Sequence, residues 1–203
     1  MTKQDNDLRV IRTKQLIKEA LIGLIEEKGF ENITVKDIAK QAGINRGTFY
    51  SHYEDKYDLM NLYIEEIFTG AEEKLIKNLQ VLFKKESQFP PADASLLLVP
   101  FLEFLYQNRV LMKTLLGPNG DLQFQDRLKK FMHDALFHRS SESLFDKNKL
   151  LVPSEYLISY ISSAHIGVVQ EWLLHEKGET PEEIAKIIFT ITTRGPLHAG
   201  GLL

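Results

Sequence analysis

Residues 34 to 56 read TVKDIAKQAGINRGTFYSHYEDK, and this stretch contains the start and stop signals of two successive short helices. Thr34, followed three residues later by Asp37, is an acidic version of the capping box that marks a helix start. Gly43 permits a tight turn, and Asn45 is a favourable N-cap for the second helix. Two short helices joined by such a turn are the pattern of the helix-turn-helix, whose second helix enters the major groove of DNA.

The helix that follows Asn45 is expected to have a core side and an outward side. Phe49 and Tyr53 are four residues apart, so both can hold this helix against the core. On the outward side, Arg46 is suited to bidentate recognition of guanine, and Thr48 can contact a thymine methyl group or a base edge. Gly47 permits close approach to the DNA.

Phosphate contacts fix the register of a protein on DNA without reading its sequence. We expect them from side chains around the two helices, above all from Tyr50, because an outward aromatic ring on a short helix needs a covering partner. For Lys36 and Lys56, a lysine that meets only water is an alternative interpretation. The predicted DNA-binding residues are Lys36, Asn45, Arg46, Gly47, Thr48, Tyr50, Ser51, His52 and Lys56.

Helical periodicity also dominates the rest of the chain, and no alternating strand pattern is convincing. We therefore predict an all-α protein of about nine helices, with a helix-turn-helix domain at residues 1–54 and a helical bundle at residues 55–203. A bend is expected near Pro100, and the tail from Gly195 to Leu203 is expected to fray. Outside the helix-turn-helix, helices are expected at about residues 9–28, 55–82, 92–107, 121–137, 153–175 and from 180 onward.

The stretch from Thr34 to Lys56 closely resembles the signature of the tetracycline-repressor (TetR/AcrR) family. The resemblance implies that Tyr50 and Lys56 contact phosphates and that Arg46, Gly47 and Thr48 face bases. Phe49 departs from the pattern, since the family often has leucine there, and this should alter packing more than function.

A second, less specific resemblance lies in the C-terminal part. The segments YQNRVLMKTLLG (106–117), GVVQEWL (167–173) and TPEEI (180–184) look like a subgroup whose C-terminal domain is similar to that of dihydroxyacetone-kinase regulators. Together the resemblances imply an Ω-shaped homodimer built on the last two helices, with an effector pocket among the middle ones. They imply a ligand-responsive repressor that binds a palindromic operator.

Two further sets of residues follow as candidates. Pocket and core use the same residue types, so the aromatic-rich middle fits an effector pocket or plain core; the candidates there are Phe101, Phe104, Leu105, Tyr106, Met112, Phe124, Phe131 and Met132. Candidates for the dimer interface are Tyr160, Gly167, Trp172, Ile184, Ile187 and Ile188. For Trp172, dimer contact and packing within the chain are both open, since aromatic residues are enriched at interfaces.

Composition excludes several classes of protein. The 203 residues include no cysteine and have a net charge of -3, so DNA affinity must come from locally placed cations. No nucleophile elbow, phosphate-binding glycine loop or zinc-protease helix is present, so neither enzymatic activity nor a cofactor or metal is expected. Polar residues from Met1 to Asp7 and the lack of a long apolar run favour a cytoplasmic protein without membrane contact. A helical interaction scaffold or co-activator that works with a protein partner is the alternative function.

Overall fold

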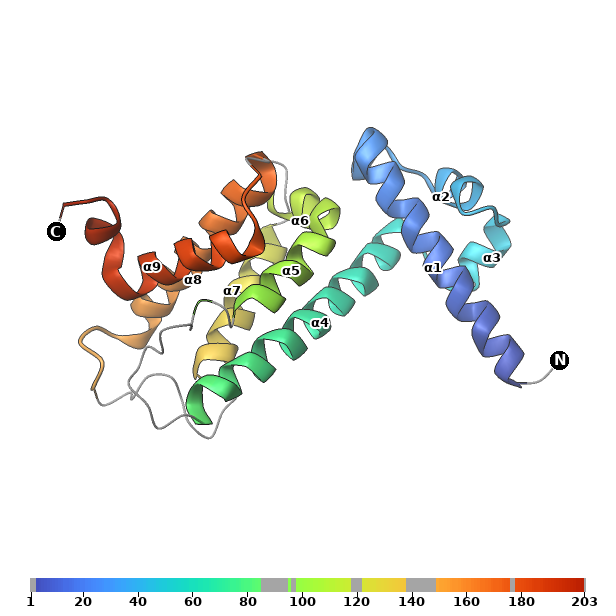
Figure 1. Cartoon of the computed structure of the whole chain (residues 1–203). Helices are drawn as coiled ribbons and strands as arrows, with labels where there is room; N and C mark the ends of the chain where they lie inside the picture. The colour runs from blue at the N-terminus through green and yellow to red at the C-terminus, as the bar shows by residue number, and fades with distance from the viewer. Residues whose placement is uncertain are drawn as a thin grey trace. The chain divides into compact units, whose positions relative to one another are not determined.

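The computed structural model describes residues 3–84, 95, 98–117, 122–137, 149–175 and 178–202. All regular structure in these ranges is helical, with nine α-helices and one short 3-10 helix (Figure 1). The prediction of an all-α protein is confirmed. The chain divides into two compact units, residues 1–67 and residues 68–203.

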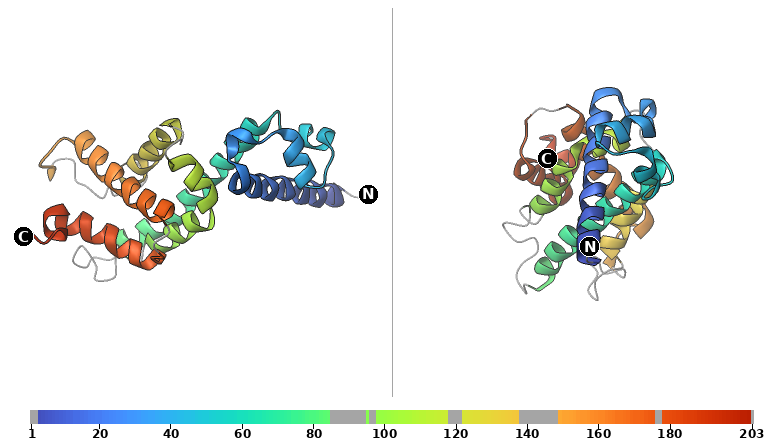
Figure 2. Two further views of the ribbon diagram at one scale, coloured as in Figure 1. Left: turned by 90° about the horizontal axis from the view of Figure 1, so that it is seen from above. Right: turned by 90° about the vertical axis from the view of Figure 1, so that its right-hand side faces the viewer.

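The first unit is built on α1 (Lys3–Lys28), a longer helix than the sequence pattern predicted. Gly29 follows it with a φ of 74°, which favours glycine, and the chain then forms the 3-10 helix η1 (Phe30–Asn32). α2 (Val35–Gln41) and α3 (Arg46–Tyr50) lie on the same side of α1 (Figure 2). The core of this unit includes an apolar stripe of α1, namely Ile17, Leu21, Leu24 and Ile25.

The helix α4 (Lys56–Lys84) starts in the first unit and continues into the second. The division between the units falls inside this helix, after Ile67, and the domain boundary after residue 54 stays a prediction. The division falls there because Leu59, Tyr63 and Ile67 are buried. The first three turns of α4 therefore belong to the core of the helix-turn-helix unit.

The second unit contains the rest of α4 and five further helices, arranged around α8. α8 packs against α6, α7 and α9, and its apolar side chains Ile158, Ile166, Val169 and Leu173 are buried. α8 and α9 run side by side (Figure 2). The bounds of the five helices are α5 (Val99–Gln107), α6 (Arg109–Leu116), α7 (Leu122–Phe137), α8 (Ser154–His175) and α9 (Pro181–Ala199).

Two polar contacts fix α8 against its neighbours. The Gln170 side-chain amide donates to the carbonyl oxygen of Leu116 at 2.9 Å, which satisfies a carbonyl group at the end of α6. Nε2 of His165 lies 2.8 Å from the Thr192 hydroxyl of α9. The Thr192 hydroxyl donates to a backbone carbonyl of its own helix, so His165 must be the donor in this pair. Burial lowers the pKa of His165.

Three details of this unit differ from the predictions. α5 begins at Val99, so Pro100 lies in its first turn, where a missing N–H costs nothing, and the bend predicted there is wrong. Residues 92–94, 96 and 97 of the predicted helix lie outside the described residues. α6 was not predicted as a separate helix.

Helical structure resumes after Gly195, whose φ of 81° and ψ of 163° kink α9, so the tail is ordered as far as Ala199 rather than frayed.

No helix in the described ranges is both long enough and apolar enough to cross a membrane.

Candidate nucleic-acid interface

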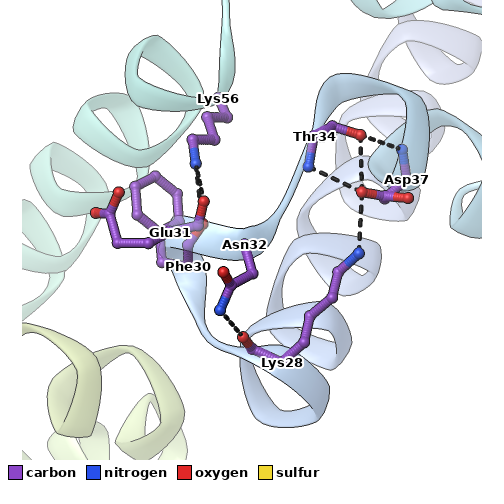
Figure 3. Close-up of polar contacts among 7 residues, drawn as sticks. All are labelled: Lys28, Phe30, Glu31, Asn32, Thr34, Asp37 and Lys56. Atoms are coloured by element: carbon purple, nitrogen blue, oxygen red, sulfur yellow. Dashed lines mark hydrogen bonds and ion pairs between the residues drawn. The ribbon is translucent and has the colours of Figure 1, made fainter.

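The start of α2 is held by the predicted capping box. The Thr34 hydroxyl accepts from the backbone N–H of Asp37 at 3.2 Å, and the Thr34 N–H donates to the Asp37 carboxylate at 2.9 Å. The Lys28 ammonium, from the end of α1, lies 2.9 Å from the same carboxylate (Figure 3). Hydrogen bonds from the Thr34 side chain and then from Lys28 lower the pKa of Asp37 well below its usual range. The first helix of the motif is therefore anchored to α1.

Lys56 anchors the start of α4 in the same region. Its ammonium donates to the backbone carbonyl oxygens of Phe30 and Glu31, each at 3.0 Å (Figure 3). The ammonium also lies 4.8 Å from the centre of the Phe30 ring and 5.0 Å from that of Tyr57. Two of its three N–H groups are therefore used inside the unit.

α3 is fixed by its cap and by two buried aromatic rings. The Asn45 side chain accepts from the backbone N–H of Thr48 at 2.7 Å, which confirms the predicted N-cap. Phe49 is 0% exposed and Tyr53 is 8% exposed, and their ring centres are 5.6 Å apart. The prediction that these two residues hold the helix against the core is confirmed, so the orientation of its other face is also fixed.

The outward face of α3 carries most of the predicted DNA-binding residues. Tyr50 is 56% exposed although its neighbour Phe49 is fully buried. The side chains of Thr48, His52 and Lys56 are half-buried, and the exposed members of the set are Lys36, Asn45, Arg46, Gly47, Tyr50 and Ser51. A tyrosine hydroxyl, a guanidinium group and an ammonium group are thus available near a short helix that is free on one side.

Two of these residues also have local roles that the sequence analysis missed. A Cβ atom at Gly47 would lie 3.1 Å from the Asn45 side-chain oxygen, so the glycine leaves room for the cap. The Ser51 hydroxyl donates to the carbonyl oxygen of Thr48 at 2.8 Å. The three-residue spacing between the cap residue Asn45 and Thr48 could have indicated these local roles.

The candidate effector residues of the second unit are buried or half-buried, except for Tyr106. Leu105, Met112 and Phe124 are buried, whereas Phe101, Phe104, Phe131 and Met132 are half-buried. The rings of Phe124 and Phe131 lie 5.5 Å and 5.8 Å from the ring of Phe68 on α4, a residue that sequence reasoning missed. Tyr106 is exposed and stacks on Trp172.

The candidate dimer residues fall into two groups. Trp172, Ile184 and Ile188 are buried within their own unit, and the Trp172 N–H donates to the carbonyl oxygen of Glu179 at 2.9 Å. Of the two alternatives for Trp172, the structure shows packing within the chain. Tyr160 and Ile187 are exposed, and Gly167 is exposed in open space, since a Cβ atom added to it would meet no atom of the described chain within 4 Å.

In the described part of the chain, no three His, Asp or Glu side chains are close enough together to hold a metal ion.

Both halves of the chain match families of known regulators. Residues 17–62 match the family described as bacterial regulatory proteins, tetR family, and residues 93–194 match the one described as transcriptional regulator C-terminal region. The chain is 33% identical over 155 residues to an HTH-type transcriptional regulator of Staphylococcus aureus, covering 65% of this chain and 80% of the relative. It is 24% identical over 187 residues to the HTH-type transcriptional regulator YxbF of Bacillus subtilis, covering 88% of this chain but 44% of that relative.

Solved structures show the same fold. A TetR transcriptional regulator from Streptococcus agalactiae is 27% identical, with a TM-score of 0.64 over 94% of this chain and 98% of the other. The dihydroxyacetone kinase operon activator DhaS is 20% identical, with a TM-score of 0.56 over 88% of this chain and 93% of the other. The likeness to DhaS shows a shared fold and does not single out its subgroup.

Proposed function

Since the chain belongs to the tetR family of bacterial regulatory proteins, we propose that it is a ligand-responsive repressor that binds a palindromic DNA operator as a homodimer. α3 is the helix that enters the major groove. The observation that carries this proposal is the contrast between the two neighbours Phe49 and Tyr50, which are 0% and 56% exposed. The buried ring fixes the helix, and the exposed ring lies on the face left for the DNA.

The outward residues divide into base readers and phosphate contacts. Arg46 and Thr48 read bases, because a guanidinium group matches guanine and a threonine matches thymine or a base edge. Tyr50, His52, Lys36 and Lys56 contact phosphates and set the register. Asn45 and Ser51 lie at the two ends of α3 and shape its approach to the DNA.

Dimerisation is proposed through the exposed positions of α8 and α9. Tyr160 and Ile187 are large apolar or aromatic side chains that a single protomer leaves 55% and 41% exposed. Gly167, on α8, has an open surface around it and leaves room for the close approach of a second helix. A symmetric pair reads two half-sites separated by about one helical turn of DNA, roughly 34 Å, or a multiple of it.

The response to a ligand depends on which form of the dimer the ligand prefers. An effector lowers DNA affinity only if it binds the form that cannot fit the operator more tightly than the form that can. α4 is shared by both units, so a change in the second unit is transmitted along a continuous helix. As a DNA-binding regulator, the protein would act in the cytoplasm.

The proposal is tested by selecting bound duplexes from a random DNA pool with the purified full-length chain at near-physiological salt. We expect enrichment of an inverted repeat that binds two protomers per duplex, with an affinity that falls as salt rises. The matched control is Tyr50→Ala, which keeps the cap and the buried ring but removes the exposed one. Weak binding without enrichment by both proteins would contradict the proposal and favour a scaffold that works with a protein partner.

The sign of regulation is tested separately, by transcription in vitro from a promoter that carries the selected operator. We expect the protein to reduce transcript levels. An increase would indicate an activator, the role that the name of DhaS gives to that protein.

A further inference from the structure

The second unit contains a pocket that differs from the effector pocket considered above. Of the earlier effector candidates, only Tyr106 lines it. It has a volume of about 300 Å³ and lies between the junction of α5 and α6 on one side and the end of α8 with Gly178 and Glu179 on the other. Ligand pockets in proteins start at about this volume, so it suits a small molecule. Because Trp172 and Tyr106 both line it, the floor of the pocket is an aromatic pair.

The two aromatic rings are stacked. The rings of Tyr106 and Trp172 are 5.4 Å apart with an angle of 22° between their planes. Trp172 is 6% exposed and its N–H is already bonded to the carbonyl oxygen of Glu179. The indole therefore offers a ring surface or edge to a ligand and no free donor, so its contribution to binding is apolar.

Two cations and one carboxylate complete the lining. Arg109 and Lys113 are four residues apart on α6, so they lie on one face of that helix. The Arg109 guanidinium lies 5.2 Å from the centre of the Tyr106 ring, next to the aromatic pair. Glu179 carries the opposite charge. With two positive groups and one negative group, the lining has a net charge of +1, which matches a ligand with a single negative charge.

We propose that this pocket is an effector site for a small aromatic carboxylate. The ring of the ligand packs against Tyr106 and Trp172, and its carboxylate accepts from the planar donor fork of Arg109, which suits bidentate binding. Lys113 adds a second positive charge. The proposal rests on the proposed ligand response, and it assigns that response to the α5–α6 junction, the end of α8 and the residues Gly178 and Glu179.

The chain offers a direct reporter for this site, because Trp172 is its only tryptophan. Titration of the full-length protein with benzoate, monitored by tryptophan fluorescence, therefore reports on the pocket without interference. Acetate carries the charge without the ring, and benzyl alcohol carries the ring without the charge. We expect saturable changes with benzoate at concentrations where neither of the other two compounds has an effect.

The key variant is Arg109→Gln, with Lys130→Gln as its control. Arg109 is exposed, and its loss should weaken benzoate binding about tenfold or more while the far-ultraviolet circular dichroism stays unchanged. Lys130 is an exposed lysine on α7 that does not line the pocket, so its loss should leave benzoate binding unchanged. Equal responses to benzoate and acetate, no response to benzoate, or equal affinities of both variants would overturn the proposed site.

A second measurement separates this site from the proposed function. Benzoate should weaken operator binding by the wild type and have much less effect on Arg109→Gln. If benzoate changes the fluorescence but not the operator affinity, the ligand site stands and its role as an effector site is wrong. If no operator exists, the fluorescence titration still decides the site.

Discussion

The ammonium nitrogen of Lys56 lies 3.0 Å from the carbonyl oxygen of Phe30 and 3.0 Å from that of Glu31. These two bonds tie the first turn of α4 to the 3-10 turn that separates α1 from α2 (Figure 3). The family resemblance implies a phosphate contact for this lysine. The structure adds a second role, because the same ammonium group joins α4 to η1 before any DNA is bound.

The first prediction is that Lys56→Gln lowers the stability of the protein as well as its DNA affinity. The free energy of unfolding should fall by about 1 kcal/mol, because two charge-assisted hydrogen bonds are lost at a partly solvated site. Urea denaturation followed by far-ultraviolet circular dichroism measures this change.

Lys36→Gln is the matched control, since Lys36 is an exposed lysine on α2. It should leave the unfolding free energy unchanged while weakening binding to all DNA sequences and lowering the salt dependence of binding by about one ion. If the two variants lost equal stability, the contacts of Lys56 with the carbonyl groups would have no energetic role.

The second prediction concerns acid. Hydrogen bonds from Thr34 and Lys28 lower the pKa of Asp37 below its usual value of 3.8. The stabilisation it provides is therefore fully present above that value and is lost as the pH falls below it towards the lowered pKa. The stability of the wild type should thus fall below about pH 4 more steeply than that of Asp37→Asn.

The Asp37→Asn protein should be less stable than the wild type at pH 7, and the difference should narrow at pH 3. Thermal unfolding at a series of pH values measures both effects. If the difference in stability between the wild type and Asp37→Asn were the same at every pH, the charge of the carboxylate would not be what holds the capping box.

The helix-turn-helix could be predicted from the sequence because its decisive signals are local. Thr34, Asp37 and Asn45 are separated from their bonding partners by three residues, and such short spacings are visible in the sequence. The burial of Phe49 and Tyr53 followed from a spacing of four residues. Local signals therefore gave both the caps and the orientation of α3.

The remaining features depend on contacts between distant residues. Nothing near Lys56 in the sequence indicates that its ammonium bonds to carbonyl groups 25 and 26 residues away. In the same way, an apolar stretch does not show whether Trp172 packs against Tyr106 of its own chain or against a second protomer. α6 was missed because its start at Arg109 follows α5 directly, without a proline or glycine to mark the boundary.

The third prediction tests a close contact between α4 and α5 in the second unit. A Cβ atom at Gly70 would lie 2.5 Å from the tip of the Phe104 ring, so Gly70→Ala forces the ring to move. We expect a loss of about 1 to 3 kcal/mol in unfolding free energy, despite the better helix propensity of alanine. Trp172 lies in the same unit, so tryptophan fluorescence during urea unfolding measures the effect.

Gly23→Ala, in α1, is the control for the helix propensity. A Cβ atom there would lie 3.6 Å from the Gln41 side-chain nitrogen, an ordinary contact, so the protein should gain up to about 1 kcal/mol in stability. If Gly70→Ala were as stable as the wild type, the contact with Phe104 would be easily relaxed.

The fourth prediction concerns dimerisation through α9. Ile187→Glu places a charge on an apolar side chain that is 41% exposed in the protomer, so it should yield monomers that remain folded. Leu62→Glu makes the same change at a 47% exposed position of α4 and should leave the dimer intact. Sedimentation equilibrium measures the mass of each variant. A dimer of Ile187→Glu with wild-type affinity would place the interface elsewhere.

The last prediction separates base reading from phosphate contact. Arg46→Ala should reduce the preference for the selected operator over single-base variants by about 1 to 3 kcal/mol at the bases that Arg46 contacts, and leave preferences at other positions unchanged. Tyr50→Phe should instead weaken binding to every duplex by a similar factor, because it loses a hydroxyl that contacts only phosphate. Both side chains are exposed and neither belongs to the core, so both variants should unfold at the wild-type temperature. Competition binding with a set of single-base operator variants measures the two patterns. If Arg46→Ala kept every base preference, α3 would have to read the operator through Thr48 or through the shape of the DNA, and the assignment of Arg46 to guanine would be wrong.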